Sequence, residues 1–306
     1  PRGPFAAPPP RRCRGRAAPI RARRVNDSPA DGLGLTRGAL PLLRDLVHER
    51  LGIYYEERRL EMLRDRVEPL VVERGFQSFL DYYYLLKYDE GARDEWGRVM
   101  DALAVPETYF WREMDQIRAI VRQTVPELVK ARPYDTLRIW SVPSASGEEP
   151  LTLAMMLEEE GWFDRAAIEV HGSDASPAAI ERARAGQYRE RSFRALPAML
   201  RDKYFDGGPG IWTVKPALHR RITSWSVVNL FDAREVAARA AVPILFCRNV
   251  FIYFSEAGIR RVVEQFADAM PTPAYLCVGA SESLLRMTAR FELEEIGGGF
   301  VYAKRR

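Results

Sequence analysis

The sequence predicts an α/β fold of the doubly wound, Rossmann-like kind, with a small N-terminal all-α domain and a β-rich insertion. The first observation is that short apolar runs alternate with amphipathic segments after residue 108, a pattern typical of a parallel sheet covered by helices on both faces. The second is helical periodicity from residue 40 to about 103. With 306 residues, 47% of them hydrophobic, the chain can bury one large core and one small one.

The N-terminal segment differs in composition from the rest. Residues 1–36 are rich in Pro, Ala and Arg and have no hydrophobic periodicity, so we expect a disordered tail. Residues 1–24 hold eight arginines and no acid, which leaves 38 basic and 42 acidic residues in the remainder. Binding of nucleic acid or an anionic membrane is the alternative to a solvated tail. We expect no nucleic-acid partner.

Residues 37–104 are predicted to form the helical domain. Apolar residues recur there at spacings of three and four, and Gly52, Gly75 and Gly91 mark breaks between about four helices. One stretch is crowded with arginines, namely Arg58, Arg59, Arg64 and Arg66. These arginines form either a charged face exposed to solvent or a docking surface for an acidic partner.

Residues 105–306 are predicted to form the α/β domain. Strands are expected at 136–142, 167–174, 243–250 and 274–282, with helices between them and a hairpin at the C-terminus. The span 189–228 interrupts this order. It contains Pro197 and the run Gly207 to Gly210, and it is too long for an ordinary loop, so we expect a small β-rich insertion.

Several classes of site are not indicated. No apolar run approaches the ~18 residues of a membrane span, so we expect a cytoplasmic protein without membrane insertion. The cysteines are far apart and are expected to be reduced, and no metal site is expected; they are Cys13, Cys247 and Cys277. The histidines are expected to be structural or on the surface; they are His48, His171 and His219.

The turn "SASGEEP" (144–150) joins a predicted strand to a predicted helix. Its small residues allow a ligand to approach the backbone, but Glu148 and Glu149 would repel a phosphate, so the turn suits a cationic ligand. Asp174 ends the next strand about 25 residues on, where an acid commonly holds ribose hydroxyls. S-Adenosylmethionine is such a ligand, because it is cationic and carries a ribose. The alternative is that the glutamates only complement the helix dipole.

Five segments carry a resemblance to a known family. They are "PETYFWRE" (106–113), "SASGEEP" (144–150), "GSDASPAAIERARAGQY" (172–188), "VNLFD" (228–232) and "FCRNVFIYF" (246–254). In their order and spacing the chain resembles the chemotaxis receptor methyltransferases, the CheR family, over residues 38 to 304. The resemblance implies a Rossmann-like S-adenosylmethionine-dependent methyltransferase domain behind a helical receptor-docking domain.

The resemblance also implies roles for residues on both sides of the pocket. Thr108 and Arg112 would lie beside the methionine portion of the cofactor, and Arg112 would also face the reacting carboxylate. Glu149, rather than Glu148, would bind the cofactor. Tyr253 would reach the methyl-transfer centre, so Arg112 and Tyr253 are the expected catalytic residues.

Further cofactor contacts are implied at the ends of the later strands. Asp174 would bind the ribose hydroxyls, Asn229 and Leu230 would border the adenine, and Arg248 and Asn249 would close the pocket. Two positions depart from the family pattern, since Pro106 replaces an Asn and Ser144 replaces a Cys or Ala. The first departure removes a polar contact to the cofactor, which bears on affinity more than on reaction type.

The implied reaction is methyl transfer to glutamate carboxylates on the cytoplasmic methylation helices of a chemoreceptor or a related signalling protein. The products are glutamate methyl esters and S-adenosylhomocysteine, and we expect a monomer. One alternative is a regulatory module that senses S-adenosylmethionine without catalysis, which Arg112 and Tyr253 disfavour and Pro106 mildly favours. Another is a small-molecule methyltransferase, which the Arg-rich helical domain disfavours. In the family that the chain resembles, the β-rich insertion can bind a peptide at the receptor's C-terminus, in members with a longer loop than residues 205–213 provide, so we expect that no tethering peptide is needed here.

Overall fold

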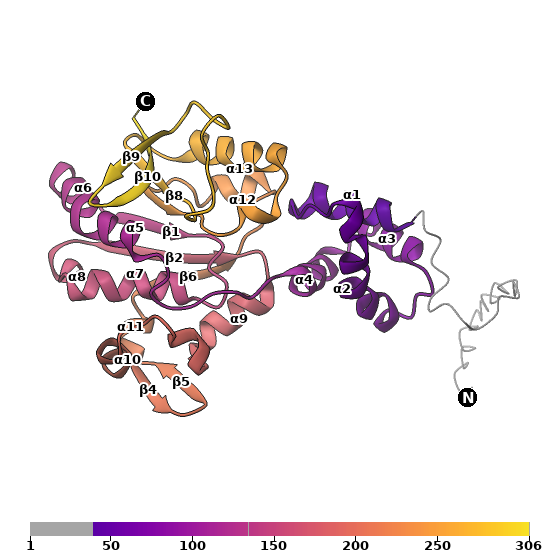
Figure 1. Cartoon of the computed structure of the whole chain (residues 1–306), viewed down its shortest axis with the longest axis horizontal. Coiled ribbons are helices and arrows are strands. Elements are labelled where there is room, and N and C mark those ends of the chain that lie inside the picture. Colours follow the sequence, from indigo (N-terminus) through magenta and orange to yellow (C-terminus); the bar gives the residue numbers. More distant parts are fainter. Residues whose placement is uncertain (1–38, 134, 306) are drawn as a thin grey trace, which may run out of the picture. The chain divides into compact units, whose positions relative to one another are not determined.

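The first part of the described chain is helical. The structure is a computed structural model that describes residues 39–133 and 135–305, so the predicted tail (1–36) and Cys13 lie outside the described residues. The helices of this part are α1 (Ala39–Leu51), α2 (Leu60–Glu73), α3 (Phe79–Tyr88) and α4 (Arg93–Leu103), drawn in indigo and purple in Figure 1. The prediction of an N-terminal all-α domain is confirmed.

Helical spacing explains the core of this domain. Leu43 and Val47 of α1, and Leu63 and Val67 of α2, are four residues apart and fully buried, as expected for one face of a helix. The buried carboxylate of Glu95 on α4 accepts hydrogen bonds from Tyr82 and Arg74 and pairs with Arg98. An acid can be buried here because charged and polar partners compensate for the lost water.

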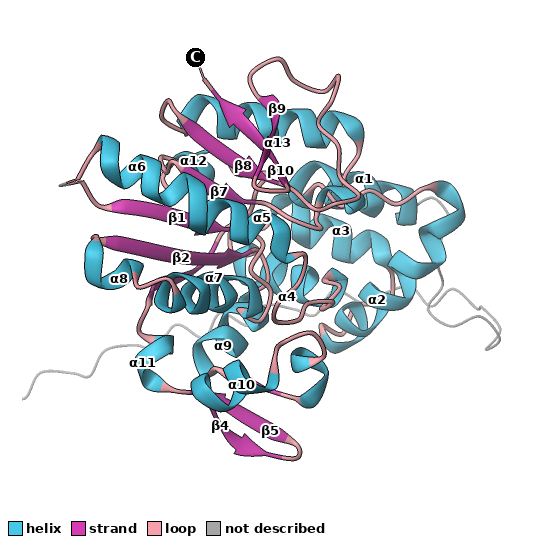
Figure 2. Ribbon diagram, turned by 60° about the vertical axis from the view of Figure 1, so that its left-hand side comes forward, coloured by secondary structure: helices cyan, strands magenta, loops and turns pink. Residues whose placement is uncertain are grey.

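A seven-stranded sheet forms the centre of the α/β domain. Its order is β6 (Ile222–Val227), β2 (Ile168–Asp174), β1 (Leu137–Ser141), β7 (Ile244–Phe246), β8 (Ala274–Cys277), β10 (Gly299–Lys304) and β9 (Glu292–Ile296). The pairs from β6 to β8 are parallel, and β10 runs antiparallel to β8 and β9. The predicted α/β fold, with a hairpin at its end, is confirmed. Figure 2 shows these strands in magenta between helices.

Alternation along the strands supplies two apolar layers. In β1, Ile139 packs into one cluster, which includes Leu151 of α7 (Glu148–Glu159), while Trp140 packs into the other, where its ring lies 6.1 Å from Phe266 of α13 (Glu256–Ala269). Successive side chains of a strand point to opposite faces. Helices therefore cover both faces of the sheet, and α8 (Trp162–Arg165), α9 (Pro177–Ala185) and α12 (Ala233–Ala237) also lie between its strands in the chain.

One helical segment was not predicted from the sequence. Before β1 the chain forms α5 (Met114–Ala119), a π-helical turn (Ile120–Thr124) and α6 (Val125–Ala131). The segment contains Pro126, a residue that usually starts, kinks or ends a helix, although its buried residues Met114, Ile117, Val121 and Val125 recur at a helical spacing. It belongs to the core nevertheless, because Ile117 and Ile120 are almost fully buried.

The interruption between α9 and the later strands contains a small separate sheet. Its order is β3 (Gln187–Tyr188), β5 (Ile211–Val214) and β4 (Phe205–Gly208), all antiparallel, and it is accompanied by α10 (Ala198–Tyr204) and α11 (Pro216–His219). The rings of Phe110, Phe193 and Phe205 pack together where this sheet joins the large domain. Strand β6 lies within the predicted span 189–228, yet it pairs with β2 in the large sheet.

Within the described residues, every helix is too short or too polar to cross a bilayer.

Candidate functional site

A cavity of about 230 Å³ lies beside the carboxyl ends of β1, β2 and β7. The structure brings all the sequence-predicted site residues to its wall, namely Thr108, Arg112, Glu149, Asp174, Asn229, Leu230, Arg248, Asn249 and Tyr253. Ligands of open α/β sheets bind at this edge because the strand-to-helix turns converge there. Pro106, at the first departure from the family pattern, is not part of the wall, whereas Ser144 is.

The turn after β1 brings the backbone close to the cavity. Ala145 and Gly147 have positive φ angles of 46° and 97°, so the chain turns sharply before α7. A Cβ on Gly147 would lie 2.9 Å from the Trp225 ring, which explains the glycine at this position. The hydroxyl of Ser144 is buried and has no hydrogen-bond partner in the described residues. It is therefore available to a ligand.

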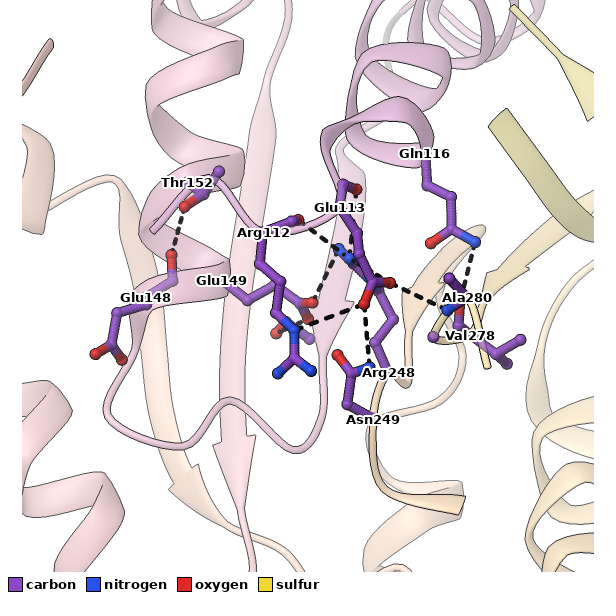
Figure 3. Close-up of polar contacts among 12 residues, drawn as sticks. Arg112, Glu113, Gln116, Glu148, Glu149, Thr152, Arg248, Asn249, Val278 and Ala280 are labelled. Atoms are coloured by element: carbon purple, nitrogen blue, oxygen red, sulfur yellow. Dashed lines mark hydrogen bonds and ion pairs between the residues drawn. The ribbon is translucent and has the colours of Figure 1, made fainter. Parts of the chain in front are cut away.

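The two adjacent glutamates have different surroundings. Glu148 accepts hydrogen bonds from the hydroxyls of Ser146 (2.8 Å) and Ser192 (3.0 Å) and does not line the cavity. Glu149 lines the cavity, accepts from Ser141 (2.7 Å) and lies 3.3 Å from Nη1 of Arg248. In Figure 3 Glu148 points away from the arginines and Glu149 points toward them. Of the two, Glu149 is placed to bind a cationic ligand.

Burial raises the pKa of Glu148, Glu149 and Asp174. Desolvation raises the pKa of Glu149, although Arg248 and the Ser141 hydroxyl oppose the rise. Asp174, at the end of β2, accepts the backbone N–H of Ser176 (2.9 Å) and of Ala145 (2.8 Å). Burial raises its pKa and these two bonds lower it. The two N–H groups fix the carboxylate at the cavity wall, and its remaining lone pairs can accept hydroxyl groups.

The segment that carries Arg112 has an unusual backbone. Trp111 and Glu113, on either side of Arg112, have positive φ angles of 68° and 47°, which cost non-glycine residues on the order of 1–3 kcal/mol each. Arg112 donates to the carbonyl of Glu107 (3.1 Å), and its guanidinium lies 5.5 Å from the centre of the Tyr109 ring. These contacts fix the guanidinium at the cavity.

The loop after β7 is held by an acid that the sequence analysis did not single out. The carboxylate of Glu282 accepts the backbone N–H groups of Asn249 (2.7 Å), Phe251 (2.7 Å) and Gly279 (2.6 Å). This loop contains Asn249, with a positive φ of 60°, and leads to Tyr253. Glu282 is the last residue of the strand predicted at 274–282, and an acid at a strand end is the signal in the sequence that could have indicated it.

The helical domain forms part of the cavity wall, which the sequence analysis did not predict. Ile53 pairs with Phe254 in an isolated antiparallel bridge, and the N–H of Tyr54 donates to the carbonyl of Tyr253 (2.9 Å). The side-chain amide of Asn229 donates to the carbonyl of Arg50 (2.8 Å). Two predicted site residues, Asn229 and Tyr253, are thus hydrogen-bonded to the last turn of α1 and to the segment that follows it.

The four predicted docking arginines, which lie in α2 and just before it, have different contacts. Nη1 of Arg66 donates to three backbone carbonyls at the end of α4, at 3.0–3.2 Å, and the residue also lines the cavity. Arg64 pairs with Glu61 and Asp65. Arg58 pairs with Glu56, and Arg59 has no ion pair in the described residues and lines the cavity. The stretch 56–68 contains four arginines and five acids, and docking of a partner through these arginines stays a prediction.

The remaining candidates from the sequence have structural contacts. Cys247 and Cys277 are buried, and desolvation raises the pKa of both thiols. The histidine rings contact Ser255 (from His48), Ser224 (from His171) and the carbonyl of Ala183 (from His219). In residues 39–133 and 135–305, no group of three His, Cys, Asp or Glu side chains is placed to hold a metal ion.

Comparisons with known proteins match both parts of the chain. A family model described as "CheR methyltransferase, SAM binding domain" matches residues 106–299, and one described as "CheR methyltransferase, all-alpha domain" matches residues 39–104. The chain is similar to chemotaxis protein methyltransferase 2 of Vibrio cholerae serotype O1, with 30% identity over 264 residues that cover 85% of this chain and 91% of the relative. It is similar to chemotaxis protein methyltransferase 1 of Pseudomonas aeruginosa, with 29% identity over 270 residues that cover 85% of this chain and 96% of the relative.

Proposed function

Because this chain belongs to the CheR methyltransferase family, we propose that it methylates glutamate side chains of a chemoreceptor or a related signalling protein. It is an S-adenosylmethionine-dependent methyltransferase with a Rossmann-like catalytic domain behind an all-α domain. The relatives are named as methyltransferases, which favours catalysis over a sensor that only binds the cofactor. One observation supports the proposal most: Arg112, Glu149, Asp174 and Tyr253 line a single cavity.

The residues of the cavity fit S-adenosylmethionine. Glu149 offers a carboxylate to an ammonium group, and Asp174 offers one to the ribose hydroxyls. Two buried polar atoms at the wall, Oγ of Ser144 and Nε of Arg248, have no partner in the described residues and can bond to polar groups of the cofactor. We propose that Thr108, Asn249, Asn229 and Leu230 complete this site.

S-Adenosylmethionine supplies an electrophilic methyl group on a sulfonium. A glutamate side chain, with a pKa near ~4.3, is already ionised at neutral pH, so the reaction needs no general base. We assign to Arg112 the binding of this carboxylate, since a guanidinium can hold two oxygens in a fixed plane. Tyr253 orients the reacting groups from the opposite loop, and enclosure by the helical domain excludes water. The products are a glutamate methyl ester and S-adenosylhomocysteine.

The partner we propose is the cytoplasmic methylation helices of a receptor. Around the cavity, Tyr54, Met62 and Ile252 are exposed apolar residues that also line it, and Arg59 lies among them. Such a rim suits a helix that presents apolar and acidic residues around the target glutamate. A cytoplasmic, monomeric enzyme is consistent with this partner.

A labelling experiment tests the function. The protein is incubated with tritium-labelled S-adenosylmethionine and membranes from the host, and receptor-sized bands are analysed for label that is released by base. Methyl esters are base-labile, whereas N-methyl groups are not. Base-stable label, or label only on small molecules, would contradict protein-glutamate methylation.

A further inference from the structure

Glu113 occupies a central position behind the cavity but does not line it. Its Oε2 accepts from Nη2 of Arg248 (3.0 Å) and from the backbone N–H of Ala280 (3.1 Å), and its Oε1 accepts from Nδ2 of Asn249 (3.3 Å). Nε of Arg112 lies 3.6 Å from Oε1. Figure 3 shows this carboxylate among Arg112, Arg248 and Asn249. One carboxylate therefore contacts three residues of the proposed site.

Arg248 is shared between two acids. Its side chain is only 1% exposed, and it lies 3.0 Å from Glu113 and 3.3 Å from Glu149. A buried guanidinium needs compensating negative charge. If Glu149 were its only acidic partner, the charge of Glu149 would be largely neutralised by Arg248 and would attract a cationic ligand less.

Glu113 also stabilises the unusual backbone around Arg112. Nη2 of Arg248 donates to the carbonyls of Arg112 (3.1 Å) and Glu113 (3.3 Å) while it pairs with the Glu113 carboxylate. The segment with two positive φ angles is thereby fixed to the ends of β7 and β8. Although burial raises it, the pKa of Glu113 is lowered below its usual value by Arg248 and by the bonds from Ala280 and Asn249. Glu113 is therefore ionised at neutral pH.

We propose that Glu113 is a positioning residue that neutralises Arg248 and so keeps the carboxylate of Glu149 available for the ammonium group of S-adenosylmethionine. This inference rests on the proposed function. Glu113 makes no contact with the cofactor in this proposal; it acts through Arg248. Loss of its charge would weaken binding of the amino-acid portion of the cofactor while the contacts to the adenine and ribose remain.

Two ligands separate these portions. S-Adenosylhomocysteine has the amino-acid portion, and 5′-methylthioadenosine has the same adenine, ribose and sulfur without it. In calorimetry on the full chain, Glu113→Gln should weaken S-adenosylhomocysteine binding about tenfold or more, as expected for the loss of a charge-assisted interaction. Binding of methylthioadenosine should change less than about twofold.

Two further variants control the experiment. Asp115→Asn removes an acid two residues away whose side chain is 77% exposed and pairs only with Arg118 in the described residues, and both affinities should stay as in the wild type. Glu113→Asp keeps the charge, so it should keep the preference for S-adenosylhomocysteine even if both affinities fall. The ratio of the affinities for the two ligands does not depend on the folded fraction of a variant.

The outcomes separate the inference from the proposed function. Wild-type affinity of Glu113→Gln for S-adenosylhomocysteine would overturn the inference. An equal loss for both ligands would also overturn it, because that result indicates general disruption of the pocket. A wild-type chain that binds neither ligand would overturn the proposed function itself, and the inference with it.

Discussion

Arg66 of helix α2 and Arg248 after strand β7 show how differently two regions of the molecule use the same side chain. Arg66 donates to three neutral carbonyls at the end of α4, and the neighbouring Arg64 is paired with acids of its own helix. Arg248 is buried between two carboxylates that come from other segments. A cluster of arginines along a sequence therefore does not by itself indicate a functional surface. The contacts made by distant segments decide the role.

The largest effect is expected in the pocket region, at Arg112. Arg112→Ala should lower kcat by at least ~10²-fold, because the substrate carboxylate loses its cation in a water-excluded site. Arg112→Lys should restore little, since an ammonium cannot hold a carboxylate in a plane. The rate of base-labile methyl ester formation is the measurement. Near-wild-type turnover of either variant would show that Arg112, like Arg66 of α2, has a structural role and no catalytic one.

Asp174 tests the acidic side of the same pocket. Asp174→Ala leaves the ribose hydroxyls without an acceptor, and S-adenosylhomocysteine binding should weaken by about 1–3 kcal/mol. Asp174→Asn keeps one acceptor and should lose less. Calorimetry measures both, with Asp164→Ala on α8 as a control that should match the wild type. Unchanged affinity of Asp174→Ala would reject the ribose assignment.

In the helical domain the expected effect is on stability. Arg66→Met removes the donor to the carbonyls of Ala102, Leu103 and Ala104, so the free energy of unfolding should fall by about 1–3 kcal/mol. Arg64→Met removes only surface pairs and should change it by less than ~1 kcal/mol. Denaturant titration of both variants gives the comparison. Equal losses would show that Arg66 has no special structural role.

The exposed arginines beside the cavity should have a smaller effect. Arg58→Glu combined with Arg59→Glu should raise the KM for receptor a few-fold at low salt, and the difference should shrink as salt screens the charges. The pair Arg138→Glu and Arg165→Glu, on β1 and α8 away from the cavity, serves as the control. If neither salt nor the reversal near the cavity alters receptor methylation, residues 58 and 59 belong to a solvated face only.

The smallest effect is expected in the insertion. Only Pro209 and Gly210 connect β4 to β5, and such a short turn offers little apolar surface to the aromatic side chain of a tethering peptide. Removing the receptor's C-terminal tail should leave the methylation rate nearly unchanged, and the isolated tail peptide should not bind. Micromolar binding in a titration, or a large loss of rate without the tail, would contradict this expectation.

Much of the fold follows from local patterns. The strands β1, β2, β7 and β8 and the helices between them were predicted because each has its own apolar signature. Strand β6 was assigned to the insertion, because "ITSWSV" alternates polar and apolar residues, as an edge strand does, and lies beside a Gly-rich segment. The helix at 114–131 was missed although its buried residues, among them Met114, Ile117, Val121 and Val125, recur at a helical spacing; Pro126 and the polar residues 122–124 interrupt the apolar signal.

The residues of the site also fall into two groups, those that the sequence predicted and those that it did not. The residues that line the cavity lie in motifs that can be recognised one segment at a time. Glu113 and Glu282 act mainly by contacts with segments 31 to 167 residues away, and no local pattern reports such contacts. For the same reason the sequence could not show that Arg66 bonds to α4 or that residues 50–54 border the cavity.

The bridge between Ile53 and Phe254 has a consequence for folding. Gly52, with a φ of 78°, lies so close to the Phe231 ring that a Cβ would come within 1.9 Å of it, and His48 bonds to Ser255 at the start of α13. The helical segment is thus packed against the loops that carry Asn229 and Tyr253. The two segments matched by separate family models therefore cannot unfold independently without exposing this interface. A cofactor that binds only the native pocket therefore stabilises both segments by mass action.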